Sequence, residues 1–363
     1  MKTTLIIIYV SFEVAVMRER TSREGCGRPR RRFLQALGGA FIGGSAGLAG
    51  CIGSVTDQRN NDGSLPSELV IGHPSPARPI YNVPVYSAFS QRMEDRGVTL
   101  KQKTFKGYTP LIAGMVRGEV DIAETSLPSL IKSRRENFPI AGFCGWTQQY
   151  VRALLVRDPI EEWSDVDGKT LVGHSDNSLT NLMLREMVRR ELGEDANVEY
   201  TNLIGTPNRV AALRGGDYEA TGVFESGARQ AVADGVGSIL AHAWDYFEDQ
   251  TIAVWGALQK NLDENEKLYR IVTEELVNSY GELYDRAAED VVADLDLTVG
   301  FPEYDTDTYV ETLSAATENR VWPTDPADML TDEKISRSQE IMQRVGIIDE
   351  SIDPGSAVDR RFL

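Results

Sequence analysis

The stretch Gly107–Ser126, GYTPLIAGMVRGEVDIAETS, decides the fold of this chain. The pair Thr109-Pro110 is typical of the start of a helix, and Gly118 is typical of its end. The run Val120-Asp121-Ile122-Ala123 then predicts a strand, which is followed by the polar triplet 124–126. The stretch therefore predicts a helix that leads into a strand with polar residues at its carboxyl end.

A second stretch, Thr206–Ser226, repeats this order. A Thr-Pro pair opens the helix, two glycines end it, and the run at 218–224 predicts the strand. In both stretches the arginine before the first glycine follows the threonine by eight residues. Because strand-helix-strand order is common, gene duplication stays open, but we expect two lobes of similar construction.

Two further apolar runs, 150–156 and 250–257, predict strands that cross between the lobes. We therefore expect an α/β fold with two lobes. The first lobe comprises 67–156 and 252–363, including C-terminal helices, and the second comprises 157–251. This division agrees with the chain length, because roughly 310 residues are more than a single core usually supports.

The N-terminal region is typical of an export signal. Arg30 and Arg31 match the twin-arginine pattern, and the glycine-rich apolar run after them ends in Leu-Ala-Gly before Cys51. We expect residues 1–50 to be removed, Cys51 to carry a lipid, and residues 51–66 to form a flexible tether. The mature protein would then be exported and anchored on the outer face of the cytoplasmic membrane. Met17 is an alternative start to Met1.

The composition restricts the partners. Residues 1–50 carry 8 of the 38 Lys and Arg and 3 of the 55 Asp and Glu, which leaves a net charge of −22 on the rest. Such a charge argues against nucleic acid and anionic lipid surfaces as partners. The low lysine content and the spread of acidic residues along the chain resemble those of halophilic proteins. Beyond residue 51 the sole cysteine is Cys144, which we expect to be a small buried residue rather than a nucleophile.

Candidate binding residues follow from the expected strand ends and helix starts, because ligands of open α/β sheets bind at the carboxyl ends of strands. Aromatic side chains among them suit a flat or apolar ligand. Arg78 and Lys106 favour an anionic group, whereas Glu124 and Glu225 favour a cationic one, so the charge of the ligand stays open. The candidates are His73, Ser75, Arg78, Tyr81, Lys106, Tyr108, Glu124, Thr125, Ser126, Trp146, His174, Ser175, Asn177, Ser178, Phe224 and Glu225.

Signs of catalysis are weak. The three histidines have no metal-ligand spacing, and no glycine-rich loop with a phosphate-binding lysine is present. The run 43–47 matches a hydrolase nucleophile motif, but it lies inside the export signal. We therefore expect no catalytic residues, no cofactor and no metal.

Taken together and in this order, the stretches 107–126, 163–172, 206–226 and 250–257 resemble the extracytoplasmic substrate-binding proteins of ABC importers. The resemblance is to the group for nitrate, sulfonate, taurine and thiamine-pyrimidine precursors. It implies a two-lobed periplasmic-binding-protein-like fold of type II, with the two crossing strands as hinge. It also implies a small-molecule solute in the interlobe cleft, delivery to ABC permease subunits, and a monomer. The proline-rich loop at 73–81 has no counterpart in the group, so the ligand class does not transfer.

Two alternatives share the architecture implied by this resemblance. One is the solute receptor of a TRAP transporter. The other is an exported decarboxylase-like enzyme acting on an aromatic acid, because the run Asp121–Leu127 resembles the Asp-x-x-Glu-x-Ser sequence of such enzymes. Fold likeness alone does not establish chemistry, so the binding protein stays our leading prediction.

Overall fold

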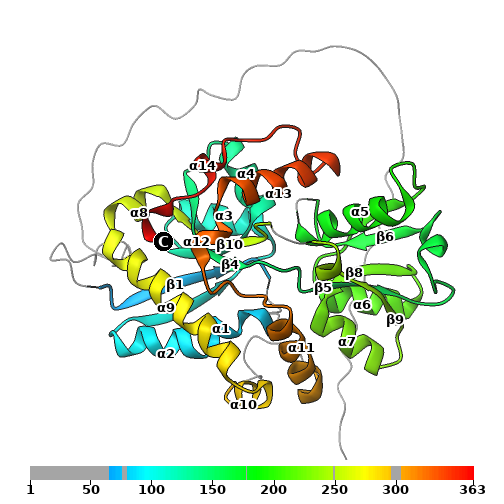
Figure 1. Ribbon diagram of the computed structural model, residues 1–363, viewed down its shortest axis with the longest axis horizontal. Coiled ribbons are helices and arrows are strands. Elements are labelled where there is room, and N and C mark those ends of the chain that lie inside the picture. The colour runs from blue at the N-terminus through cyan, green and yellow to red at the C-terminus, as the bar shows by residue number, and fades with distance from the viewer. Residues whose placement is uncertain (1–64, 76–79, 177, 248–249, 296–303) are drawn as a thin grey trace, which may run out of the picture. The chain divides into compact units, whose positions relative to one another are not determined.

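The computed structural model describes residues 65–75, 80–176, 178–247, 250–295 and 304–363. The expected export signal at 1–50, the expected lipid site Cys51 and most of the expected tether at 51–66 lie outside these residues. Within them the structure is an α/β arrangement of two sheets (Figure 1).

The first sheet has the strand order β2-β1-β3-β10-β4. Its first three strands are parallel, and β10 runs antiparallel to both neighbours. The parallel strands are joined through helices, as the pattern around Gly107–Ser126 predicts. The bounds are Glu68–His73 for β1, Thr99–Thr104 for β2, Ile122–Ser126 for β3, Ile140–Thr147 for β4 and Ala253–Leu258 for β10.

The second sheet has the order β7-β6-β8-β5-β9 and repeats this plan. Three parallel strands come first, and β5 then runs antiparallel to both β8 and β9. The expectation of similar construction in two lobes is thereby confirmed. The bounds are Arg152–Val156 for β5, Thr170–Gly173 for β6, Glu199–Asn202 for β7, Ala220–Phe224 for β8 and Ser238–His242 for β9.

The chain passes from the first sheet to the second between β4 and β5, and it returns between β9 and β10. Both apolar runs predicted to cross therefore form strands, and each strand joins the sheet that the chain has just reached. Because β5 pairs in the second sheet, residues 152–156 belong structurally there, although the sequence places them at the end of the first lobe.

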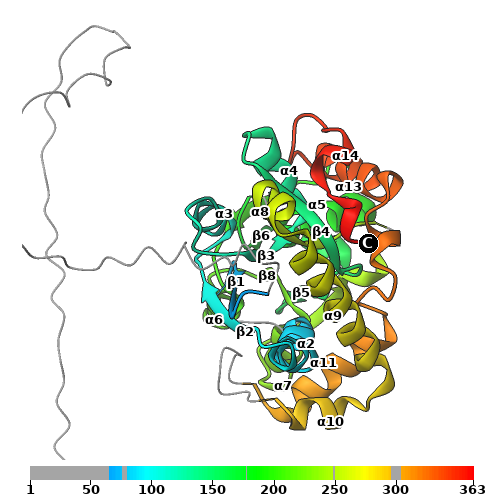
Figure 2. The same cartoon turned by 90° about the vertical axis from the view of Figure 1, so that its left-hand side faces the viewer.

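Helices cover both sheets. In the first half, α9 packs on α1 and α2, while α4 packs on α13 and α14 (Figure 2). In the second half, α5 and α6 pack on β8, and α7 packs on β5 and β9. The helix bounds are Val83–Tyr86 for α1, Ala88–Asp95 for α2, Tyr108–Val116 for α3, Leu127–Arg135 for α4, Leu179–Leu192 for α5, Thr206–Gly215 for α6, Glu225–Ala233 for α7, Gln259–Glu264 for α8, Glu266–Asp285 for α9, Ala288–Ala293 for α10, Thr306–Glu318 for α11, Pro326–Met329 for α12, Asp332–Arg344 for α13 and Pro354–Ala357 for α14, with short 3-10 turns at Ile80–Asn82, Trp163–Val166, Ala243–Asp245 and Arg360–Phe362.

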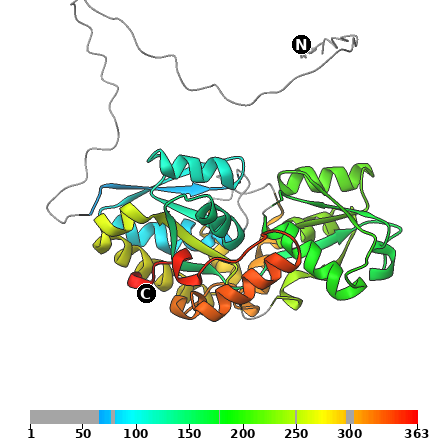
Figure 3. The same cartoon turned by 90° about the horizontal axis from the view of Figure 1, so that it is seen from above.

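C-terminal helices reach the second half of the molecule. Helix α11 packs on α7, and α13 packs on α5 (Figure 3). Arg344 at the end of α13 lies 3.4 Å from the buried carboxylate of Glu186 on α5. These contacts lie between the two halves and would have to change if the halves moved apart.

The two expected helix starts are displaced toward the N-terminus. The residues before the first turns are Gly107 and Gly205, with φ of 108° and 92°, rather than Thr109 and Thr206. Glycine reaches such angles without strain, so it can turn the chain from a strand into a helix there. The threonines follow inside the first turn.

The apolar core includes buried residues of both sheets. Trp255 on β10 is fully buried, and its indole N–H donates to Tyr280 on α9 at 2.7 Å. Cys144 is buried and unbridged, as expected, and burial raises the pKa of its thiol. Across the residues that the structure describes, no helix is both long and apolar enough to span a membrane.

Candidate functional site

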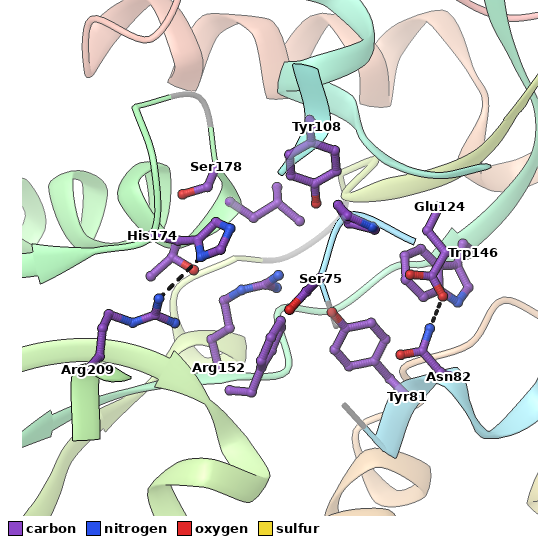
Figure 4. A pocket seen from close by; sticks show the side chains of 14 residues that line it. Ser75, Tyr81, Asn82, Tyr108, Glu124, Trp146, Arg152, His174, Ser178 and Arg209 are labelled. Atoms are coloured by element: carbon purple, nitrogen blue, oxygen red, sulfur yellow. Dashed lines mark hydrogen bonds between the residues drawn. The ribbon is translucent and has the colours of Figure 1, made fainter. Parts of the chain in front are cut away.

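A pocket lies between the two halves of the molecule, where the ends of β3, β4, β6 and β8 meet (Figure 4). Both sheets contribute, because parallel strands present their carboxyl ends and the following helix starts at one edge. Its lining residues are Pro74, Ser75, Tyr81, Asn82, Tyr108, Glu124, Trp146, Arg152, His174, Ser178, Leu179, Thr180, Arg209 and Phe224.

Half of the sequence-predicted binding residues line this pocket. They are Ser75, Tyr81, Tyr108, Glu124, Trp146, His174, Ser178 and Phe224. Arg78 and Asn177 fall outside the described residues. Their roles, like those of the pocket residues, stay predictions.

The remaining predicted residues lie elsewhere. Lys106 and Ser175 line a neighbouring outer cavity of about 550 Å³, which shares Tyr108 and His174 with the inner pocket. His73, Thr125 and Ser126 are buried beside the pocket. The hydroxyl of Ser126 accepts from the backbone N–H of Ser129 and so caps α4.

Glu225 is fully buried and does not line the pocket. It begins α7, and its carboxylate lies 3.1 Å from both His242 and Arg229. Within the described residues, its oxygens therefore face the His242 ring and the Arg229 guanidinium of the second half rather than the space between the sheets.

Glu124 is the acidic residue of the pocket. His73 Nδ1 lies 2.8 Å from its Oε1, a close contact without the alignment of a hydrogen bond. The side-chain amide of Asn82 donates to the same oxygen. His73 Nε2 lies 3.0 Å from the side-chain oxygen of Gln102 on β2. The Glu124 carboxyl group thus already has two protein neighbours, His73 and Asn82.

Arg152 is the principal cation of the pocket. The residue is 7% exposed, and its Nε has no hydrogen-bond partner among the described residues. Its guanidinium carbon lies 4.7 Å from the centre of the Phe224 ring. Burial raises the pKa of the Tyr81 phenol well above its ordinary value, although the nearby Arg152 charge opposes the shift. Tyr81 is therefore a neutral hydroxyl at neutral pH.

His174 and Arg209 form the wall on the side of the second sheet (Figure 4). Their Nδ1 and Nη1 atoms lie 3.3 Å apart. Burial, followed by the charges of Arg209 and Arg152, lowers the pKa of His174 to about 4. Burial, followed by Arg152, lowers the pKa of Arg209 to about 9. At neutral pH the imidazole is therefore neutral and the guanidinium charged.

Aromatic rings line the pocket between the halves. The ring centres of Tyr81 and Phe224 are 5.3 Å apart, and those of Tyr81 and Trp146 are 5.1 Å apart. Trp146 in turn lies 5.3 Å from Trp255 in the core. Because Phe224 belongs to β8 and Trp146 to β4, this row of rings joins the two sheets.

The inner pocket is small in this state, with a cavity volume of about 40 Å³. A buried water needs roughly 10–15 Å³ by this measure, so the cavity has room for only a few waters. A ring-sized ligand would require the side chains or the sheets to move apart. No cluster of three metal-ligating side chains occurs within the described ranges.

Sequence reasoning did not select several pocket residues, notably Asn82, Arg152 and Arg209. Arg152 carried a usable signal, because it is the one charged residue in the apolar run 150–156. Arg209 carried none, since an arginine in an exposed helix pattern is ordinarily a surface residue.

Comparison with known proteins agrees with the fold. A model of the family described as NMT1/THI5 like matches residues 94–227, a range that contains both strand-helix-strand stretches. The match confirms the resemblance drawn from those stretches. No curated protein matches the sequence.

Three solved structures illustrate the similarity. The ligand-binding component of an ABC-type import system from Staphylococcus aureus has 14% identity and a TM-score of 0.67, over 81% of this chain and 97% of that one. The alkanesulfonate-binding protein SsuA from Xanthomonas axonopodis pv. citri, bound to MOPS, has 15% identity and a TM-score of 0.65, over 81% and 99%. The desulfurization enzyme DSZB has 14% identity and a TM-score of 0.56, over 81% and 97%. The chain therefore has the periplasmic-binding-protein-like fold, and at such identities this likeness shows the fold alone.

Proposed function

We propose that this chain is an exported, lipid-anchored receptor that captures a small organic anion between its two sheets and delivers it to an ABC permease. The observation that carries the proposal is the buried Arg152 guanidinium, which lines a pocket between the two halves. Its Nε has no hydrogen-bond partner among the described residues. The sulfonate-binding neighbour adds support by analogy.

The charge balance of the pocket favours an anion. Arg152 and Arg209 are both cationic, and no carboxylate among the described residues lies within ion-pair distance of either. Glu124 is the one acidic residue of the lining, and its carboxyl group already accepts from Asn82 and contacts His73 at 2.8 Å. A buried, uncompensated cation is costly, and a bound carboxylate or sulfonate would offset that cost.

The walls favour a solute with a flat or apolar body. Tyr81, Trp146 and Phe224 offer ring faces and edges on which such a body can stack. The donors Arg152 and His174 lie on the side of the second sheet. The solute would therefore place its acidic group toward the second sheet and its body toward the aromatic rings.

Ligand entry requires an opening motion on this proposal, because the cavity volume is about 40 Å³. The two connections between the sheets, β4 to β5 and β9 to β10, would act as the hinge. The contact of Tyr81 with Phe224 and that of Arg344 with Glu186 would break on opening. Bound solute would shift this equilibrium toward the closed form, which the permease would recognise.

On this proposal, the lipid anchor keeps the receptor at the membrane. A lipidated Cys51 would hold the receptor beside its permease, and two acyl chains suffice for stable attachment. A TRAP transporter receptor would use the same fold with a different membrane partner.

An exported decarboxylase-like enzyme on an aromatic acid is the second candidate. The fold shared with a desulfurization enzyme and the His73–Glu124 pair beside the pocket favour it. Cys144 offers it no nucleophile, because the thiol is fully buried and its pKa is raised.

Native mass spectrometry of the chain begun at Ser64 tests the proposal. We expect one acidic small molecule to co-purify, and to be released unchanged on denaturation. A molecule recovered after loss of carbon dioxide or sulfite would favour the enzyme. A cationic molecule, or a protein that stays empty and binds none of a panel of small carboxylates and sulfonates, would contradict the proposed receptor.

A further inference from the structure

Arg209 on α6 is a buried cation whose hydrogen-bond partners among the described residues are all neutral. The residue is 2% exposed. Its guanidinium donates to the carbonyl oxygens of Gly222 and Leu203, both at 2.8 Å, and to the hydroxyl of Thr206 at 3.2 Å. Among the described residues no carboxylate pairs with it. Burying such a charge is expensive, so its position calls for a reason beyond packing.

The remaining contact of Arg209 is with His174. Its Nη1 lies 3.3 Å from His174 Nδ1, and the backbone N–H of Gly205 approaches the same nitrogen at 3.4 Å. Both neighbours can only donate, because a guanidinium and a backbone amide have no lone pair to offer. His174 Nδ1 must therefore accept, and the proton of the neutral ring must lie on Nε2.

We propose that Arg209 is a positioning residue that holds His174 in the tautomer protonated at Nε2, so that His174 donates a hydrogen bond to an acceptor oxygen of the solute. His174 and Arg209 both line the pocket, and the His174 ring lies beside the Arg209 guanidinium (Figure 4). The role in binding rests on the proposed function, whereas the tautomer rests on the contacts of Arg209 alone.

The consequence is selectivity for one kind of solute group. His174 and Arg152 would both present donors to the same end of the pocket. A carboxylate, sulfonate or carbonyl oxygen can accept from both. An ammonium or amide N–H at that position would face two donors and leave buried groups unpaired, which is strongly disfavoured.

The donor role would hold across a wide pH range. Burial is the largest effect that disfavours protonation of the His174 ring. The positive charges of Arg209 on α6 and Arg152 on β5 disfavour it further. With a pKa of about 4, the imidazole stays neutral at pH 6–8. Protonation would in addition remove the acceptor that Arg209 and Gly205 face.

Histidine side-chain nitrogen NMR on the full chain in detergent micelles, with solute removed, tests the tautomer. The chain has three histidines, and the His174→Gln variant assigns the signal of interest. We expect the Nε2–H pattern for His174, unchanged from pH 6 to pH 8. The Nδ1–H pattern, or a ring that titrates in this range, would overturn the proposal without any reference to the solute.

Variants test the role of Arg209. A hydrogen bond to a charged group shifts such an equilibrium by about tenfold or more. Arg209→Met should therefore raise the share of the Nδ1–H tautomer of His174, with the Gly205 N–H alone left to favour the Nε2–H form. Arg214→Met is the matched control, since Arg214 lies on the same helix but pairs with Asp234 at the surface. A pure Nε2–H pattern in Arg209→Met would overturn the role of Arg209. If that variant does not fold, Arg209→Lys provides the comparison, with the same signal expected to shift.

Inorganic sulfate serves as the binding probe. We expect sulfate to move the His174 Nε2 signal in the parent protein, and Arg209→Met to weaken sulfate binding about tenfold. Unchanged sulfate affinity in Arg209→Met would overturn the role in binding. Absence of any sulfate binding, together with the Nε2–H pattern, would support the tautomer and count against the anion receptor.

Discussion

Replacing Arg152 with methionine should separate binding from folding. The side chain contributes a buried cation to the pocket and a stacking contact with Phe224 at 4.7 Å. Removing one partner of a buried, hydrogen-bonded charge pair costs about 2–5 kcal/mol of binding free energy. The Kd of the co-purifying solute should therefore rise by at least about 30-fold.

Without bound solute, the Arg152→Met variant should fold about as stably as the parent protein. Loss of the stacking contact costs about 0.5–2 kcal/mol, whereas removal of a buried donor without a partner returns about 1–3 kcal/mol. These two effects oppose each other, so the free energy of unfolding should change by between a loss of about 1 kcal/mol and a gain of about 2.5 kcal/mol.

Isothermal titration calorimetry and urea unfolding of the same preparation measure both quantities. Arg185→Met is the matched control, because Arg185 stacks on Tyr200 at 4.4 Å and does not line the pocket. Solute affinity that survives Arg152→Met, or that falls equally in the control, would refute the reasoning.

Three further predictions concern the anchor and the pH dependence of stability. Cys51→Ala should release the exported protein from membranes on fractionation, and unchanged membrane association would reject the anchor. Burial alone would raise the pKa of Glu186, but hydrogen bonds from two arginines of its own helix lower it overall. The Glu186 carboxylate therefore contributes its full stabilisation above its pKa in the unfolded chain, and this stabilisation is lost as the pH falls through its pKa in the folded protein. Glu186→Gln should flatten the decline in unfolding free energy between about pH 5 and pH 3. The hydrogen bond to Glu225 raises the pKa of His242. The contact with Glu225 therefore contributes its full stabilisation below the pKa of His242 in the unfolded chain, and this stabilisation is lost as the pH rises through the pKa of His242 in the folded protein. An NMR titration that gives a pKa of His242 below about 6.5 would contradict this prediction.

The sequence predicted the plan of the two sheets because proline and glycine mark the turns clearly. The Thr-Pro pairs lie in the first turns of α3 and α6, the Arg-Gly pairs mark their C-terminal ends, and the runs after them form β3 and β8. Strand β4 has no such marks: its run Ile140–Thr147 mixes glycine, cysteine and tryptophan, and only its fully buried position in the first sheet makes it a strand.

The site was harder to predict than the fold for a physical reason. Strand ends could be placed at one edge of a sheet, which located Glu124, His174 and Phe224 near the pocket. Whether a side chain at that edge faces the pocket depends on its partners across the fold. Glu225 follows the same rule as Glu124, yet His242 and Arg229 surround its carboxylate.

A crystal structure of the protein with its co-purified solute tests the central claim most directly. We expect the solute between the two sheets, with oxygens of its acidic group about 3 Å from the Arg152 guanidinium and from His174 Nε2. Its body should contact the rings of Tyr81, Trp146 or Phe224. A solute bound elsewhere, or one that presents a cationic group to Arg152, would contradict the account.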